Sequence, residues 1–377
     1  MNMRIENTYI RKAAKYVGMA LTALLLVCML LGAWAGYLDP AVWAAPAMLC
    51  LVFPVLWLLS LGAGVLWLWL SRNKAYAAAC GVALLASLPT LLAVSPLRFP
   101  EGLRPGETEL KLLTYNVAHF KDLESGKAQG SRTLSYIIHS GADVVCMQEL
   151  YSLEQGKKRG VATQAQIDSV QELYPYRIMT GLEEEVLLSK YPAVYVDGYK
   201  EDARSYFNYQ VYHLDVRGRQ LTLVNVHMPS YRLTKNQRAI ASHLKHNPGD
   251  VLDREENATL YRKLRIAFEQ RAEAARQLRN MTDTIKGPLI ICGDFNDVPG
   301  SYAWRTLRSG GMEDAYCKTG KGPMITFNAN HLLFHIDQVL YRPDCGVRPL
   351  GVSRGSLKSS DHYPVMARFA LAPDEMK

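Results

Sequence analysis

Three long apolar runs near the N-terminus constrain the fold of this chain more than any other feature of its sequence. They lie at 16–38, within 42–70 and at 75–97, and none of them contains Asp, Glu, Lys or Arg. Each run supplies the roughly 20 apolar residues that cross a hydrocarbon core about 30 Å thick. Trp and Tyr gather near the run ends, as in the aromatic belts of membrane proteins. The sequence therefore predicts an all-α transmembrane anchor of three helices over residues 1–97.

Two of these runs also have a different interpretation. The first run resembles a cleaved signal peptide in its position and basic flank, although its apolar core is longer than such peptides have. The third run is diluted by Ala, Gly and Pro89, so a buried helix of a soluble domain is the alternative there. Three spans remain the interpretation that we develop.

Basic residues predict how the spans are oriented. They precede the first run and separate the second from the third, whereas the turn between the first two runs contains Asp39 and no basic residue. The positive-inside rule then places the N-terminus and the 71–75 loop in the cytoplasm. We expect a multi-pass protein of the inner (cell) membrane whose remaining part is extracytoplasmic; with only two spans it would be cytoplasmic. The basic residues are Arg4, Arg11, Lys12, Lys15, Arg72 and Lys74.

The overall charge says little about nucleic-acid binding. The net charge is +8, and residues 1–96, with six basic and two acidic side chains, supply +4 of it. Much of the excess therefore flanks the membrane runs rather than forming a basic surface. With 49% hydrophobic and 21% charged residues, the chain is neither disordered nor collagen-like.

The remainder alternates strand-like and helix-like segments. A short Pro- and Gly-rich linker at 98–108 leads into a domain expected at 109–377. Helical patterns cover 132–140, 163–173 and 260–285, and the pattern as a whole predicts an α/β or α+β domain with mixed sheets. The strand-like runs lie at 110–115, 143–148, 185–189, 209–216, 220–226, 289–292, 335–341 and 365–369.

Polar side chains stand where these apolar segments end or begin. Because the ends of neighbouring strands meet at one edge of a sheet, we expect these side chains to line one cleft. Taken singly, each also fits a turn, a cap or a buried polar pair. Their recurrence in one domain favours a functional site. In chain order they are Asn116, Glu149, His227, Asp294, Asn296, Asp337, Asp361 and His362.

The residue types in this set favour one kind of chemistry. Carboxylate and amide oxygens suit Mg²⁺ or Mn²⁺ better than zinc, and histidines exchange protons near neutral pH. The sequence has no Ser or Cys nucleophile motif, Walker loop or GxGxxG pattern. Metal-assisted attack of water on a phosphate ester is therefore the reaction that we expect.

The motifs around these residues resemble the endonuclease/exonuclease/phosphatase superfamily over about residues 108–370. They are LLTYNV, VVCMQEL, VNVHMPS, GDFND, HIDQVL and SSDHYPV, in the family's order. The N-terminal spans and an AFxxRAxxA helix at 267–275 are similar to bacterial membrane-bound members. The resemblance implies a four-layer sandwich of two packed mixed β-sheets flanked by helices, behind the all-α anchor.

The resemblance also implies roles and a cofactor, Mg²⁺ or Mn²⁺. Glu149 with Asn116 would hold the metal, and Asp361 would complete the metal or phosphate environment. Asp294 and Asn296 would orient the attacking water and the phosphate. His362, oriented by Asp337, would be a base or a phosphate-binding group, and His227 would protonate or stabilise the leaving oxygen.

This sequence departs from the family pattern in two places. His335 and Gln338 stand where many relatives have Arg and Tyr, which would either weaken phosphate electrostatics or remove a structural ion pair. Three acids at 183–185 replace a Gly-hydrophobic-Ala pattern, and acids near the cleft would repel an extended polyanion.

Two classes of function follow. The first is a membrane-tethered, divalent-metal-dependent phosphodiesterase whose partners are the lipid bilayer and a phosphate ester, whether a lipid headgroup, nucleic acid or a small ester. A nuclease version would use basic clusters such as 157–159 or 262–265. The second is a non-catalytic membrane module that retains the fold, which a complete site disfavours.

Overall fold

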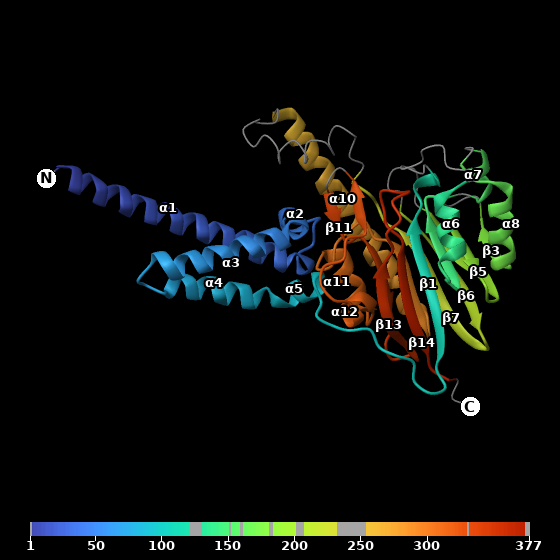
Figure 1. The fold of residues 1–377 in the computed structure, drawn as a ribbon. Helices are drawn as coiled ribbons and strands as arrows, with labels where there is room; N and C mark the ends of the chain where they lie inside the picture. The colour runs from blue at the N-terminus through green and yellow to red at the C-terminus, as the bar shows by residue number, and fades with distance from the viewer. Residues whose placement is uncertain are drawn as a thin grey trace.

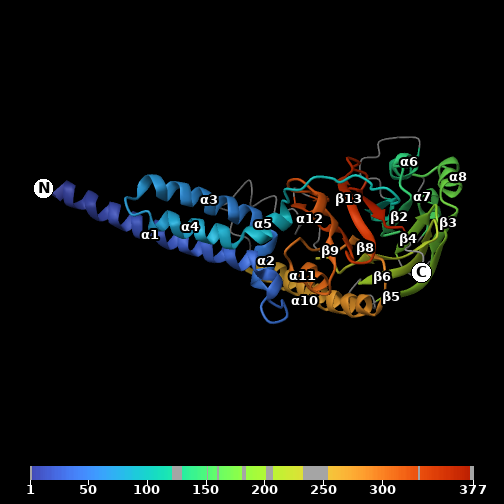
Figure 2. The same ribbon diagram turned by 90° about the horizontal axis from the view of Figure 1, so that it is seen from below.

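A computed structural model describes residues 2–120, 130–150, 152–158, 161–180, 184–200, 207–231, 254–329 and 332–373. A bundle of helices projects from one side of a β-sandwich (Figures 1 and 2). The N-terminus and the α3–α4 turn lie at the end of the bundle remote from the sandwich (Figure 1).

The N-terminal bundle consists of apolar helices. Trp67 Nε1 donates a hydrogen bond to Thr22 Oγ1 at 2.9 Å, which ties α3 to α1. The helices are α1 (Asn2–Ala33), the 3-10 turn η1 (Ala35–Tyr37), α2 (Ala45–Leu51), α3 (Phe53–Leu70), α4 (Ala75–Ala86) and α5 (Leu88–Val94).

The third predicted span is bent. Within the described residues, the segments Lys12–Ala33 and Phe53–Leu70 are each long and apolar enough to cross a membrane, whereas α4 and α5 form a pair bent by 53°. Pro89 sits in the first turn of α5, where it lacks the N–H that would continue the hydrogen-bond ladder of α4. The bundle thus offers two membrane-spanning helices, or three if the bent pair is a single span.

The first sheet of the sandwich has the order β13-β14-β1-β2-β4-β3. Only β1 and β2 are parallel in it, and the other pairs are antiparallel. Its strands are β1 (Thr108–Asn116), β2 (Val144–Gln148), β3 (Tyr176–Met179), β4 (Glu185–Ser189), β13 (Val347–Arg354) and β14 (Val365–Leu371).

The second sheet has the order β5-β6-β7-β8-β12-β9. Here β7 and β8 are parallel, and β6 and β7 form the expected hairpin across Arg217 and Gly218. Its strands are β5 (Ala193–Lys200), β6 (Asn208–Val216), β7 (Arg219–His227), β8 (Leu289–Asp294), β9 (Glu313–Asp314) and β12 (Asp337–Tyr341), and β10 (Phe327–Ala329) pairs separately with β11 (Leu332–Phe334).

The two sheets pack face to face and helices cover their outer faces, so the fold is the expected four-layer sandwich of mixed sheets. Leu112 and Cys146 of one sheet meet Leu223 and Cys292 of the other in the central core. The outer helices are η2 (Ala118–Phe120), α6 (Arg132–His139), α7 (Glu154–Lys158) and α8 (Gln164–Leu173) beside the first sheet, and α10 (Arg254–Thr284) and α11 (Tyr302–Ser309) beside the second. The short helix α12 (Ala315–Thr319) contacts β13 of the first sheet and β12 of the second.

The anchor packs directly on the sandwich. Ala35 and Cys50 share a buried cluster with Val298 and Ile336, which flank the candidate site in the chain. A Cβ atom on Gly36 would lie 2.6 Å from the carbonyl oxygen of Gly300, so only glycine permits this approach of the two backbones. The N-terminal helices and the site-bearing loops are therefore one packed unit.

Candidate active site

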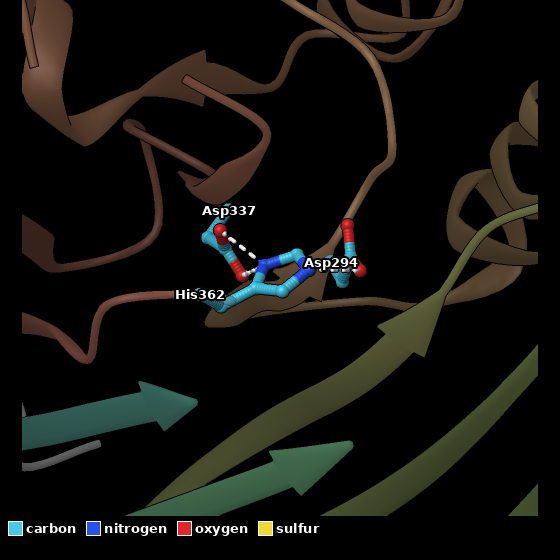
Figure 3. Close-up of side chains that lie close together, drawn as sticks. All are labelled: Asp294, Asp337 and His362. Carbon is cyan, nitrogen blue, oxygen red and sulfur yellow. Dashed lines mark hydrogen bonds and ion pairs between the residues drawn. The ribbon is translucent and has the colours of Figure 1, made fainter. Parts of the chain in front are cut away.

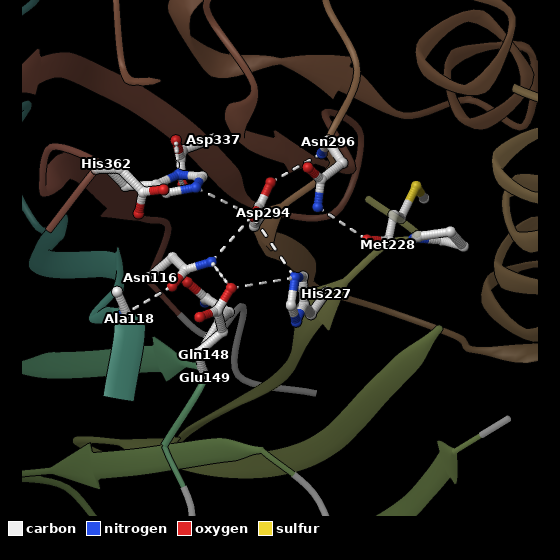
Figure 4. A network of polar contacts seen from close by, with 12 residues as sticks. Asn116, Ala118, Gln148, Glu149, His227, Met228, Asp294, Asn296, Asp337 and His362 are labelled. Atoms are coloured by element: carbon white, nitrogen blue, oxygen red, sulfur yellow. Dashed lines mark hydrogen bonds and ion pairs between the residues drawn. The ribbon is translucent and has the colours of Figure 1, made fainter. Parts of the chain in front are cut away.

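Parallel strand pairs bring four of the predicted residues to one edge of the sandwich. In the first sheet, Asn116 at the end of β1 pairs with Gln148, and Glu149 follows directly. In the second sheet, His227 at the end of β7 pairs with Asp294 at the end of β8. Because both parallel pairs end at the same edge, their polar side chains converge there (Figure 4).

Antiparallel neighbours deliver the remaining residues to that edge. Asp337, the first residue of β12, pairs with Asp294. Strand β14 begins with Val365 opposite Thr114, so His362 lies just beyond the strand, level with the end of β1. The order of strands in the two sheets therefore gathers residues separated by more than 200 positions in the chain.

His362 lies between two buried carboxylates (Figure 3). Its Nδ1 lies 2.9 Å from Asp337 Oδ2, and its Nε2 lies 3.5 Å from Asp294 Oδ2. Burial alone lowers the pKa of His362, but Asp337 and Asp294 outweigh it and raise the pKa to about 10. The imidazole is thus oriented by one carboxylate and directs its other nitrogen to the second.

Asn116 joins the two sheets at the centre of the site. Its Nδ2 donates to Glu149 Oε1 at 3.0 Å and to Asp294 Oδ2 at 3.1 Å (Figure 4). His227 Nε2 lies 3.7 Å from Asp294 Oδ2 and 4.0 Å from Glu149 Oε1. His119, which the sequence analysis did not select, contacts the other oxygen of the Glu149 carboxylate, with its Nε2 3.7 Å from Oε2.

Two hydrogen bonds hold Asn296 in the loop after β8. Its backbone N–H donates to Asp294 Oδ1 at 2.8 Å, and its Nδ2 donates to the carbonyl of Met228 at 2.9 Å. Asn296 and Glu149 both have positive φ angles, 50° and 56°, which L-residues adopt at some cost. Such strain at two site residues is typical of functional loops that their surroundings hold in place.

Asp361 is half-buried beside His362. Its backbone carbonyl accepts a hydrogen bond from the Asn328 N–H at 2.8 Å. Its negative charge adds to those of Asp337 and Asp294 in raising the pKa of His362. Asp361 is therefore linked to the histidine by its charge.

The donor set fits a divalent cation. Glu149 and Asp294 share the Asn116 amide, and in the described part of the chain only histidines, and no Lys or Arg, approach either carboxylate within ion-pair distance. Asp294, Asp337 and His362 offer ligand atoms within 4.8 Å of one another, but Asp337 and His362 already bond to each other. Glu149, whose side chain is 27% exposed, is the carboxylate open to an ion from solvent.

Three supporting residues were not predicted. Thr326 Oγ1 accepts hydrogen bonds from the N–H groups of Ile336 and Asp337, both at 3.0 Å, and so fixes the start of β12. The Phe327 ring packs edge-on against His362 at 5.0 Å between centroids. Arg271 is fully buried, and its Nε lies 3.3 Å from Asp297 Oδ2 in the loop after Asn296. Arg271 belongs to the AFxxRAxxA motif, but neither that motif nor the sequence around Thr326 and Phe327 signals the partner, because each contact is non-local.

The structure shows what the residues that depart from the family pattern contact. Gln338 Nε2 donates to the Asp297 carbonyl at 2.7 Å, and so supports the loop after β8. His335 is buried, which lowers its pKa, and packs edge-on against Tyr316. Of the three acids at 183–185, Glu185 is fully buried in β4 opposite Gln148 and so is not exposed to solvent, and Glu183 lies outside the described residues.

Comparisons with solved structures give distant similarities. A humanized TDP2 of D. rerio is 15% identical, with 69% of this chain and 98% of that chain covered and a TM-score of 0.44. An endonuclease/exonuclease/phosphatase from Bacteroides vulgatus is 16% identical, covering 70% and 99%, with a TM-score of 0.43. Sphingomyelinase C from Streptomyces griseocarneus is 18% identical, covering 69% and 99%, with a TM-score of 0.40.

Comparisons of the sequence are more decisive. No curated protein matches it at a significant level. Residues 15–94 match a domain of unknown function (DUF8431), and residues 113–362, more than half of the chain, match the Endonuclease/Exonuclease/phosphatase family. That second match spans every polar residue that the strand ends bring together, from Asn116 to His362. The chain therefore belongs to the endonuclease/exonuclease/phosphatase family.

Proposed function

We propose that this protein is a membrane-tethered phosphodiesterase that uses Mg²⁺ or Mn²⁺ to hydrolyse a phosphate diester. The observation that carries the proposal is the contact of His362 with both Asp337 and Asp294, next to Asn116 and Glu149. An oriented imidazole beside acceptors for a hard cation is a set suited to activating water against phosphorus.

The residues divide the work as follows. Glu149, Asn116 and Asp361 would hold the cation, which supplies charge to polarise the phosphate when it is bound. Asp294 and Asn296 position the attacking water and the scissile group. His362, held by Asp337, binds the phosphate as an imidazolium or, in its unprotonated form, takes the proton of the water, and His227 faces the leaving oxygen.

Two observations support a substrate at the membrane surface. The cluster that contains Ala35 and Cys50 of the anchor also contacts Phe327, whose ring packs against His362. The N-terminus and the α3–α4 turn, where the basic residues gather, lie at the far end of the bundle (Figure 1). We propose that this far end is cytoplasmic, that the bent α4–α5 pair is the third span, and that the site is extracytoplasmic.

The test of the activity is hydrolysis of bis-p-nitrophenyl phosphate by the full chain in detergent micelles. Mg²⁺, Mn²⁺ and EDTA are compared, with Asp294→Ala as the inactive control. Metal-dependent release that EDTA abolishes supports the proposal. No release by folded protein with either metal contradicts it and favours the non-catalytic membrane module.

The test of topology is protease protection in sealed vesicles of known orientation. If the sandwich is extracytoplasmic, it is digested in right-side-out vesicles and protected in inverted ones. The opposite pattern would contradict the third span.

A steep fall in the turnover of DNA as the salt concentration rises, with no hydrolysis of lipid headgroups, would favour the nuclease alternative.

A further inference from the structure

A cavity of about 750 Å³ lies where the anchor meets the sandwich, and no residue of the candidate active site lines it. Its walls are the C-terminal part of α10, the helix α11, and Gly36 and Tyr37 of η1. Figure 2 shows α10 and α11 beside the sandwich end of the helical bundle. Four arginines line the cavity: Arg276, Arg279, Arg305 and Arg308.

Two of these arginines are neutralised by carboxylates. Arg276 bonds Asp39 and Glu273, each at 2.8 Å. Arg279 Nε lies 3.5 Å from Asp283 Oδ2. Their charges are therefore largely compensated within the protein.

The other two arginines are not compensated. Among the described residues, no carboxylate lies within ion-pair distance of Arg305 or Arg308, and the Nε atom of each is buried without a hydrogen-bond partner. The guanidinium carbon of Arg305 lies 3.6 Å from the centroid of the Tyr37 ring, and that of Arg308 lies 4.4 Å from the Trp304 ring. Aromatic faces thus hold two guanidinium groups in place, and no carboxylate of the described residues neutralises either of them.

The cavity lies at the level where lipid headgroups would be. Tyr37 follows Ala33, the last residue of the first candidate span, by four positions. Trp34, Tyr37 and Trp43 are 43%, 57% and 48% exposed, which is typical of aromatic residues at a membrane interface. A phosphate group at this depth would belong to a phospholipid of the same leaflet.

We infer that this cavity binds the phosphate of an anionic phospholipid, with Arg305 and Arg308 as its principal ligands. Paired guanidinium groups bind phosphate oxygens through parallel, charge-assisted hydrogen bonds. The bound lipid would fasten α11, and with it the loop after β8, to the bilayer surface. This inference rests on the proposal that the N-terminal helices lie in a membrane, but not on the proposed chemistry of the active site.

The test measures the thermal stability of the full chain in a nonionic detergent with added phosphatidylglycerol, phosphatidylcholine or inorganic phosphate. We expect phosphatidylglycerol to raise Tm and the other two to have little effect. In Arg305→Gln/Arg308→Gln, the concentration of phosphatidylglycerol for half of the effect should rise at least about tenfold. The control Arg217→Gln/Arg262→Gln removes the same charge from exposed positions and should behave as the wild type.

Three results would overturn the inference. They are an equal effect of phosphatidylcholine, an equal effect of inorganic phosphate, which would mark a site for free anions, and an unchanged response in the Arg305/Arg308 variant. If that variant fails to fold, Arg305→Lys/Arg308→Lys keeps the charge but loses the bidentate guanidinium, so it should bind phosphatidylglycerol several-fold more weakly. If native mass spectrometry shows that this Lys variant retains phosphatidylglycerol as well as the wild type does, the site is refuted. Metal-dependent turnover of bis-p-nitrophenyl phosphate, measured in the same micelles, should be unchanged in the variants, so failure here is separable from failure of the proposed function.

Discussion

Replacing Arg271 by Met should destabilise the protein more than any exposed substitution, because it strands a buried charge. The Arg271 side chain is 0% exposed; its Nε pairs with Asp297 at 3.3 Å and its Nη1 donates to the Pro229 carbonyl at 3.0 Å. The guanidinium also stacks 4.1 Å from the Tyr231 ring centroid. Breaking a buried pair by removing one partner costs about 3–5 kcal/mol. At roughly 2–4 °C of Tm per kcal/mol, the expected loss is about 6–20 °C.

The double variant distinguishes this cause from lost packing. Asp297→Asn should also destabilise, but Arg271→Met/Asp297→Asn removes both charges, so its loss should be smaller than the sum of the two single losses. The measurement is thermal unfolding of the full chain in detergent, followed by far-ultraviolet circular dichroism.

The pH dependence gives a second check on the same pair. Burial raises the pKa of Asp297, and Arg271 opposes that rise. Without Arg271, the folded-state pKa of Asp297 rises further above its unfolded value. As the pH falls, the folded variant therefore takes up a proton before the unfolded chain does, and its loss of stability relative to the wild type shrinks. Any of three results would refute the reasoning. They are a Tm of Arg271→Met within about 2 °C of wild type, strictly additive losses of stability in the two single variants, and a loss of stability in Arg271→Met that grows as the pH falls.

The other predictions concern turnover of the model diester. His362→Ala should lower kcat by about 10²–10⁴-fold, and Asp294→Ala at least as much, with unchanged far-ultraviolet spectra; wild-type-like rates in both would exclude this site. Asp337→Asn should be milder, and it removes a charge that raises the pKa of His362, so the pH midpoint assigned to this histidine should move to lower pH; a shift upward contradicts the orienting role. Glu149→Gln should raise the Mg²⁺ concentration for half-maximal rate by at least about tenfold, and an unchanged metal titration would remove Glu149 from the proposed ligands.

Local patterns predicted β1, β2, β4, β6, β7, β8, β12 and β14 and the helices α6, α8 and α10, whereas the remaining strands and helices of the sandwich were not predicted. The apolar runs that predicted strands at 110–115 and 289–292 became β1 and β8, and the amphipathic pattern at 260–285 lies in α10. These elements are buried on one or both faces, so the spacing of apolar residues along the local sequence predicts them. Strand β13 was missed because it is an edge strand, with a bulge between Pro349 and Gly351 that interrupts any alternation.

The anchor shows the limit of hydropathy. Composition suggested three spans, with a buried helix as the alternative for the third run, and two helices have the length and composition of a span. The third run is broken between Ala86 and Leu88, next to Pro89, because the amount of apolar sequence does not decide the path of the backbone.

By itself, the sequence determined which polar residues stand at strand ends and, through their order and motifs, the family. Only the tertiary structure decided which groups are in contact. Asn116 bridges the two sheets, Arg271 pairs with Asp297 in the loop after β8, and two arginines stack on aromatic rings without carboxylate partners among the described residues. The physical reason is that strand propensity acts over a few neighbouring residues. The fields and hydrogen bonds of a site act across space, between segments that the sheet order brings together.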